Sequence, residues 1–201
     1  NEIRGGSASN AGDVNGDGLA DLFVGACSDG SGIGKGYVVF GKTDGTAVNL
    51  SGVAAGTGGF VIRGESAGDG TGFAVSQAGD LNGDGLGDFI LGAYAAGNSY
   101  TGKSYVVMGK TGTTTIELSA VANGVGGFVI YGASKNDTSG YAVSAAGDIN
   151  GDGFADLMVS SPSYGSSPPG KAYVILGGTQ FAGANPIDFV GDATALSLIH
   201  I

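Results

Sequence analysis

A threefold internal repeat is the feature that most limits how this chain can fold. One nine-residue pattern occurs at a near-constant spacing as DVNGDGLAD (13–21), DLNGDGLGD (80–88) and DINGDGFAD (148–156). A second pattern occurs at the same spacing as GKGYVVFG (34–41), GKSYVVMG (102–109) and GKAYVILG (170–177). A period of this length over nearly the whole chain indicates structural units that stack on one another. We therefore predict one array, with repeats at approximately 1–59, 60–127 and 128–201.

Each repeat is typical of four short β-strands. The apolar runs are short, rich in β-branched and aromatic residues and bounded by turn-forming residues, and no helical period is present. In the middle unit the expected strands are 73–78, 88–93, 104–108 and 128–131. Four consecutive antiparallel strands in one repeat form one blade of a β-propeller. The predicted fold is therefore all-β, with about three four-stranded blades that make a partial propeller.

Three blades are fewer than the roughly four to eight that close a propeller. We expect the remaining blades to come from a longer parent chain or from oligomerisation, because apolar blade faces would otherwise be exposed. Gly6 stands where Phe73 and Tyr141 stand in the other units, so the first strand of the first unit is expected to be degenerate or truncated. Residues 198–201 fall where the last strand of the third unit is expected, although 193–201 follow the repeat only loosely.

Composition excludes several classes of function. The 201 residues carry 8 basic and 18 acidic side chains, a net charge of −10, which argues against binding to nucleic acid or to an anionic membrane surface. No apolar run approaches about 18 residues, so no membrane insertion is expected. The one cysteine, Cys27, excludes an internal disulfide. The lone histidine, His200, leaves little for acid–base work, so we predict no enzyme, no catalytic residue and no organic cofactor.

The three nine-residue stretches, here called the acidic loops (13–21, 80–88 and 148–156), predict a metal site each. Side-chain oxygens stand at loop positions 1, 3, 5 and 9, and the carbonyl of position 7 is expected to complete the set. Oxygen ligands at alternate positions with glycine at position 6 select a hard cation, and calcium is the leading candidate. The predicted ligands are Asp13, Asn15, Asp17, Leu19 and Asp21; Asp80, Asn82, Asp84, Leu86 and Asp88; and Asp148, Asn150, Asp152, Phe154 and Asp156.

The alternative is that these loops are only turns, since Asn-Gly and Asp-Gly are strong turn formers. Charge favours the metal, because the loops hold nine of the 18 acidic residues and thus account for most of the net charge. Without a cation, three carboxylates would repel one another in each loop, so stability should depend on calcium. Sites of this kind bind at about 0.1 to 1 mM, which indicates an extracellular or cell-surface location.

The acidic loops and their flanking strands resemble a known family. The stretch GFAVS (72–76) followed by GDLNGDGLGDFILGAY (79–94) is similar to an FG-GAP repeat of the integrin α-chain β-propeller family, closest to its bacterial secreted members. The resemblance implies a seven-bladed ring, calcium in the acidic loops, and adhesion or ligand recognition on the opposite face. Departures from the pattern include Gly6 in unit one and SSP (160–162) in unit three.

Topology places two kinds of loop at the end opposite the acidic loops: those between the second and third strands of a unit, and those that join consecutive units. The candidate recognition loops are 94–102 and 133–140, with 29–34, 65–71 and 162–169 as their equivalents, and they would contact a protein or glycan ligand. One other motif is set aside: GNSYTGKS (97–104) satisfies the P-loop pattern, but a strand is expected where that motif needs a helix.

We thus predict a non-catalytic, calcium-binding propeller segment of a secreted or surface protein that mediates adhesion or ligand binding. Two alternatives stay open. The segment is a module appended to an extracellular hydrolase, such as a phospholipase or a polysaccharide-cleaving enzyme, or it is a structural spacer in a large surface protein.

Overall fold

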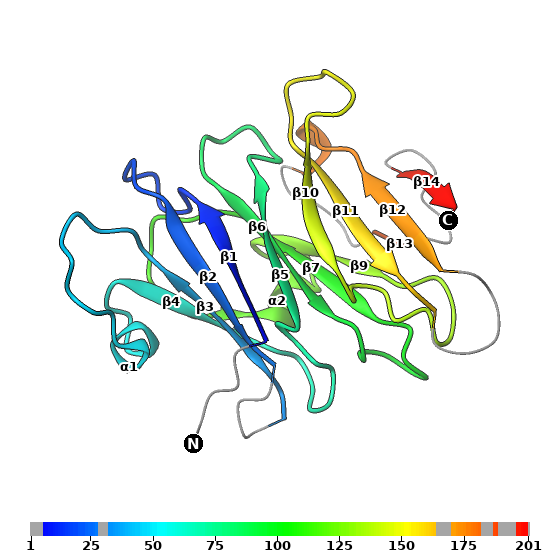
Figure 1. Ribbon diagram of the computed structural model, residues 1–201, viewed down its shortest axis with the longest axis horizontal. Helices are drawn as coiled ribbons and strands as arrows, with labels where there is room; N and C mark the ends of the chain where they lie inside the picture. The colour runs from blue at the N-terminus through cyan, green and yellow to red at the C-terminus, as the bar shows by residue number, and fades with distance from the viewer. Residues whose placement is uncertain (1–5, 28–31, 164–169, 182–186, 189–195, 201) are drawn as a thin grey trace.

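The computed structural model of the chain is built of three β-sheets with a few short helices (Figure 1). It describes residues 6–27, 32–163, 170–181, 187–188 and 196–200. The first sheet contains β1 (Ser7–Gly12), β2 (Asp21–Ala26), β3 (Lys35–Val39) and β4 (Gly59–Arg63). The second contains β5 (Ala74–Gly79), β6 (Asp88–Ala93), β7 (Lys103–Val107) and β9 (Gly127–Tyr131). The third contains β10 (Val143–Gly147), β11 (Asp156–Ser161), β12 (Lys171–Ile175) and β14 (Leu196–His200).

These strands pair antiparallel with their neighbours, so each sheet contains a four-stranded meander, and a short parallel strand described below extends the first and second sheets to five strands. The predicted strands of the middle unit agree with β5, β6, β7 and β9 to within one residue. β14 pairs with β12 as the expected last strand of the third unit. The all-β prediction of propeller-type blades is therefore confirmed, and Lys103–Val107 is a strand, as the rejection of the P-loop required.

The expectation of a degenerate first strand is wrong. β1 has six residues and pairs with β2 in the register that β5 and β10 use with their neighbours, including an irregularity just before the acidic loop. Strand pairing needs backbone groups rather than the aromatic side chain that Gly6 lacks, so the strand forms without it.

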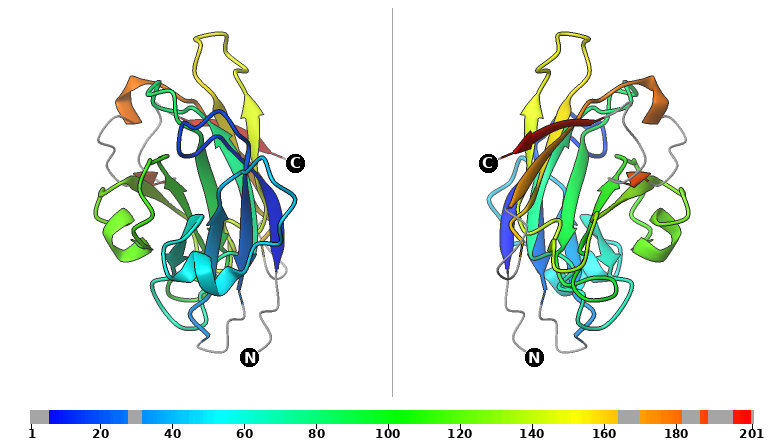
Figure 2. Two further views of the ribbon diagram at one scale, coloured as in Figure 1. Left: turned by 90° about the vertical axis from the view of Figure 1, so that its left-hand side faces the viewer. Right: turned by 90° about the vertical axis from the view of Figure 1, so that its right-hand side faces the viewer.

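The short helices and two short strands occupy the links between the third and fourth strands of each unit. These elements are α1 (Leu50–Ala54), β8 (Ile116–Glu117), α2 (Leu118–Val121), η1 (Thr179–Phe181) and β13 (Ile187–Asp188). β8 pairs parallel with β4 of the preceding sheet, and β13 pairs parallel with β9 in the same way. Figure 2 shows α2 on the side of the molecule away from β1 and β10. No described helix is both long and apolar enough to cross a bilayer.

The three sheets stack face to face, with β5 between β1 and β10 (Figure 1). Equivalent residues of the second strands show which faces are covered. Phe89 of the middle sheet is fully buried, and its ring lies 5.0 Å from that of Phe23 in the first sheet. Leu157 is likewise buried against the middle sheet, whereas the equivalent Leu22 of the first sheet is 57% exposed. The face that bears Leu22 is therefore uncovered at Leu22, whereas Tyr37 and Val39 on the same face are buried in a cluster with Val53 of α1.

On the opposite face of each sheet, the exposed residue belongs to the third sheet rather than to the first. Phe23 of the first sheet and Ile90 of the second are fully buried, but the equivalent Met158 of the third sheet is 40% exposed. Among the described sheets, only the middle one is thus covered on both sides, and every residue of β6 is buried. Apolar stacking in this direction buries a continuous core between neighbouring sheets, as in a repeat array.

Candidate functional site

The three acidic loops project from one end of their sheets, at the upper edge in Figure 1. The first strand of each sheet (β1, β5 and β10) leads into the acidic loop and ends at a glycine with positive φ: Gly12 (78°), Gly79 (74°) and Gly147 (71°). The strand register shifts at this point in all three sheets. A glycine tolerates this left-handed backbone because it has no Cβ, and the resulting bulge directs the chain into the loop.

The aspartate at position 1 organises each loop. Asp13 Oδ1 accepts hydrogen bonds from the N–H groups of Gly16 (2.8 Å) and Asp17 (3.0 Å), and its Oδ2 accepts one from Gly18 (2.8 Å). The same three bonds recur at Asp80 and at Asp148. This carboxylate therefore fixes the turn, because it satisfies three consecutive backbone donors of the loop.

Positions 3 and 5 contact each other at the exposed tip of the loop. Asn15 accepts a hydrogen bond from the N–H of Asp17 at 3.0 Å and donates one from its amide to Asp17 Oδ2 at 2.9 Å. Asp17 Oδ1 in turn accepts from the N–H of Leu19 at 2.9 Å. Both other loops repeat these contacts. The two side chains of the tip therefore belong to one hydrogen-bonded unit.

The aspartate at position 9 is buried beneath the loop. Asp21 accepts a hydrogen bond from the N–H of Val14 (2.8 Å) on one oxygen and from that of Gly41 (2.7 Å) on the other. Asp88 and Asp156 make the equivalent bonds. Because the second donor follows the third strand of the sheet, this carboxylate ties the loop to a distant part of the same unit.

Electrostatics in the middle loop show the effect of gathering three acids. Burial is the largest cause and raises the pKa of Asp88 to about 6, against the lowering effect of its two backbone N–H donors. The negative charges of Asp84 and Asp80 raise this pKa further. In the first loop, burial and the charges of Asp17 and Asp13 raise the pKa of Asp21 in the same direction. The carboxylates of a loop are therefore close enough to repel one another.

The chemistry of the predicted ligands fits a hard cation, because the side chains at positions 1, 3, 5 and 9 all offer oxygen atoms. No basic residue within a loop balances the negative charge of its three aspartates. Within the described part of the chain, however, no three acidic, histidine or cysteine side chains converge as a metal centre. The structure gathers positions 1, 3 and 5 at the tip and holds position 9 below it. The fifteen ligands remain a prediction.

At the opposite end lie the loops that join one sheet to the next. We call residues 64–72 the first inter-blade loop and residues 132–140 the second. The second loop runs beside residues 94–102, and its backbone N–H groups donate to carbonyls there: Asn136 to Ser99 (2.8 Å), Thr138 to Tyr100 (3.0 Å) and Ser139 to Thr101 (3.1 Å). Three backbone bonds close together give the two segments one fixed arrangement.

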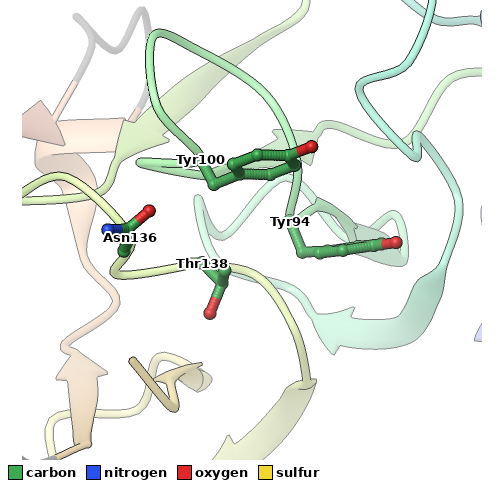
Figure 3. Close-up of a pocket in the computed structure, with 4 residues that line it drawn as sticks. All are labelled: Tyr94, Tyr100, Asn136 and Thr138. Atoms are coloured by element: carbon green, nitrogen blue, oxygen red, sulfur yellow. The ribbon is translucent and has the colours of Figure 1, made fainter. Parts of the chain in front are cut away.

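A pocket of about 360 Å³ opens between these two segments. The described residues that line it are Tyr94, Tyr100, Asn136 and Thr138, and Figure 3 shows the two tyrosine rings on one side and Asn136 and Thr138 across from them, with the Thr138 hydroxyl directed away from the rings. The predicted recognition loops 94–102 and 133–140 thus meet at one pocket. Parts of their equivalents, at 29–31 and 164–169, lie outside the described residues.

The first inter-blade loop is closed by an ion pair instead. Lys103 Nζ lies 2.6 Å from Glu65 Oε2, and the Tyr105 hydroxyl donates a hydrogen bond to the same oxygen. Burial opposes ionisation of Glu65, but the hydrogen bonds from Lys103 and Tyr105 outweigh it and hold the pKa of this carboxyl below its usual value. The equivalent position in the second loop is Ala133.

Comparison with known proteins identifies the repeats. The FG-GAP repeat matches residues 71–107 and 139–175, which are equivalent segments of the second and third units. The second and third units of the chain are repeats of the FG-GAP family. Each matched FG-GAP segment contains a complete acidic loop and the three strands around it.

Curated relatives carry similar FG-GAP repeats within much longer proteins. Integrin alpha pat-2 of Caenorhabditis briggsae is 34% identical over 111 residues, which is 52% of this chain and 8% of that protein. The phosphatidylinositol-glycan-specific phospholipase D of Dictyostelium discoideum is 31% identical over 165 residues, 75% of this chain and 17% of that protein. Integrin alpha-PS2 of Drosophila melanogaster is 29% identical over 161 residues, 75% and 11% respectively. The chain therefore spans only a small part of the length of each of these relatives.

Sequence reasoning missed two features of this FG-GAP array. It did not assign the glycine after the third strand, such as Gly109, as the second anchor of the buried aspartate. The recurrence of that glycine once in every repeat was the available signal. It also gave Asn136 and Thr138, which lie in the candidate loop 133–140 and replace Gly68 and Gly70 of the preceding unit, no role of their own in lining a pocket.

Proposed function

We propose that this chain is a calcium-binding, non-catalytic FG-GAP propeller segment of a secreted or surface protein, and that it binds a ligand through its inter-blade loops. The observation that carries the proposal is the acidic loop, which recurs in each unit with the same hydrogen bonds and, in the first two units, gathers carboxylates whose charges raise the pKa of the buried aspartate. A bound divalent cation removes that repulsion, and affinities near 0.1 to 1 mM suit an extracellular calcium level.

Exposed faces support further blades on both sides of the segment. Leu22 on one end face and Met158 on the other are uncovered, whereas their equivalents in the middle sheet are buried. Val48, the equivalent of Ile116 in β8, is exposed and is assigned to no described strand. A preceding blade would offer Val48 the parallel pairing that β4 offers Ile116. These blades come from the parent chain or from association of copies.

A second candidate function follows from one relative. The Dictyostelium phospholipase D covers 75% of this chain at 31% identity, and integrin alpha-PS2 covers the same share at 29%, so a relative named as a hydrolase matches the chain as well as an integrin does. This favours, as the alternative, a propeller module attached to an extracellular hydrolase. In that case the ligand-binding loops would serve to place a separate catalytic domain near its substrate.

Calcium titration into chelator-stripped protein tests the proposal. We expect three sites by isothermal calorimetry and a higher melting temperature; at tenfold excess over Kd each site adds about 1.4 kcal/mol to the free energy of unfolding. Asp84→Asn should reduce the stoichiometry from three sites to two. Asp44→Asn, which removes an exposed carboxylate outside the loops, is the matched control and should leave three. If calcium produced neither heat nor a change in melting temperature, the acidic loops would be turns that bind no calcium.

A further inference from the structure

We propose that the pocket between residues 94–102 and the second inter-blade loop binds a neutral sugar ring of a glycan. This inference deepens the ligand-binding part of the proposed function and rests on it. At about 360 Å³ the pocket lies at the small end of the range for small-molecule sites, roughly 300 to 1,000 Å³. None of its described lining residues is charged.

Two tyrosine rings form one wall of the pocket (Figure 3). Tyr94 is held in place by Phe73, with ring centroids 4.6 Å apart, and by Tyr141 at 5.7 Å. Tyr100 is 56% exposed. A fixed aromatic face beside a solvent-exposed one suits the C–H face of a pyranose, which is apolar although its edge carries hydroxyl groups.

The opposite wall supplies hydrogen-bonding groups for such an edge. The Asn136 amide both donates and accepts, and the Thr138 hydroxyl, which donates to the Asp137 carbonyl at 2.7 Å, keeps acceptor capacity. Between them in sequence, Asp137 is almost fully buried; its Oδ2 accepts from the Ser134 N–H, whereas Oδ1 has no hydrogen-bond partner among the described residues. The Asp137 carboxylate is not among the described residues that line the pocket, so the hydrogen-bonding groups of this wall are those of Asn136 and Thr138.

The backbone is strained at three of the four residues that line the pocket. Tyr100, Asn136 and Thr138 have φ of 56°, 63° and 50°. In the first inter-blade loop the positions equivalent to Asn136 and Thr138 are Gly68 and Gly70, which adopt positive φ without strain. Side chains in such conformations cost about 1 to 3 kcal/mol each and persist mainly at functional sites. The second loop therefore keeps two polar side chains that its backbone disfavours.

The same observations disfavour other ligands. An extended peptide needs free backbone groups, but the carbonyls of residues 99–101 already accept hydrogen bonds from the N–H groups of Asn136, Thr138 and Ser139. An anionic ligand would meet a chain with a net charge of −10 and a lining without a basic residue. A neutral polyhydroxylated ring with one apolar face matches both walls.

Saturation-transfer NMR on the calcium-loaded chain tests the inference with methyl glycosides of glucose, galactose, mannose and N-acetylglucosamine. We expect transfer to at least one of them, strongest at the ring protons of one face. Methyl glucuronide should bind more weakly than methyl glucoside. Failure of all four neutral sugars, or tighter binding of the glucuronide, overturns the inference; the calcium titration decides the proposed function separately.

Variants then place the binding in the pocket. Tyr100→Ala and the double variant N136G/T138G should each weaken binding by about tenfold or more, or about 1.4 kcal/mol. Val125→Ala, at a 65% exposed residue outside the pocket lining, is the control and should not change it. The double variant should also melt at a higher temperature, because it restores the glycines of the first loop. Unchanged binding in Tyr100→Ala would overturn the assignment.

Discussion

The two inter-blade loops share one backbone path but differ in what their side chains do. Both have positive φ at three alternate positions, 68, 70 and 72 in the first and 136, 138 and 140 in the second. Both pair, through an isolated bridge, with the segment that joins the second and third strands of the same unit: Gly34 with Thr71, and Gly102 with Ser139.

The side chains of the two loops differ. The first loop has glycine at all three positions and closes with the Glu65–Lys103 ion pair. The second has Asn136 and Thr138, an unpaired Asp137 oxygen and a pocket. The same scaffold thus carries an ion-paired contact with glycine at all three positive-φ positions in one place, and a pocket with non-glycine residues at two of them in the other.

The largest effect should come from the close contact that both loops share. A Cβ added at Gly25 would lie 2.0 Å from the Gly72 carbonyl oxygen, and one added at Gly92 would lie 1.9 Å from that of Gly140. Because these neighbours are backbone, Gly25→Ala and Gly92→Ala should each lower the free energy of unfolding by about 3 kcal/mol or more. Urea denaturation followed by circular dichroism measures this.

Gly112→Ala is the control for these two variants, because a Cβ there meets nothing within 4 Å. It should cause no loss of stability. Suppose that Gly92→Ala were tolerated while Gly25→Ala were not. The contact of Gly92 with the second inter-blade loop would then be more adaptable than that of Gly25 with the first, which would contradict a scaffold shared by both loops.

The second largest effect should be specific to the first loop. Glu65→Ala removes the acceptor of a partly buried lysine and of the Tyr105 hydroxyl, and we expect a loss of about 2 kcal/mol. Glu117→Ala breaks the more exposed pair with Arg63, at 3.2 Å, and should change stability by less than about 1 kcal/mol. Equal losses in both variants, measured by urea denaturation, would contradict the assigned role of Glu65.

Exchange of the residues at one equivalent position should give a smaller effect of opposite sign in the two loops. Gly70→Thr puts a β-branched residue at φ 68° and a Cβ 2.8 Å from the Tyr94 ring, so a loss of about 1 to 2 kcal/mol is expected. Thr138→Gly relieves the equivalent strain and should gain up to about 1 kcal/mol, reduced by the greater entropy of glycine in the unfolded chain. Thermal and urea unfolding of both variants measure these changes. A loss of stability in Thr138→Gly would show that its φ is not strained.

The smallest expected effect is the pH dependence of the Glu65 contribution. Since the pKa of Glu65 is lowered in the folded state, its stabilisation is fully present above the usual value of 4.5 and is lost as pH falls through the folded pKa. The stability difference between the wild-type chain and Glu65→Ala should therefore be constant from about pH 7 to pH 5 and shrink below about pH 4.5. A difference that grew toward acid pH would mean that Glu65 is not held ionised by its partners.

Much of this architecture is readable from the sequence because it repeats. Short β-branched runs between glycines and aspartates predicted the strands of the middle unit to within one residue. The period also predicted β14, although its residues follow the repeat loosely. The degenerate first strand was mispredicted, because the comparison of Gly6 with Phe73 concerned a side chain, whereas β1 is held by backbone pairing with β2.

The sequence by itself determined the units, the strands and the position of every acidic loop. Strand and turn signals depend on residues close together along the chain, and the internal repeat shows the same signals three times. Only the tertiary structure decided which residues meet across units and between distant strands. It showed that Asp21 bonds to Gly41, that Leu22 and Met158 lie on opposite uncovered faces, and that Tyr100 and Thr138 line one pocket. These contacts depend on how blades stack and on the backbone angles of loops, which no local pattern specifies.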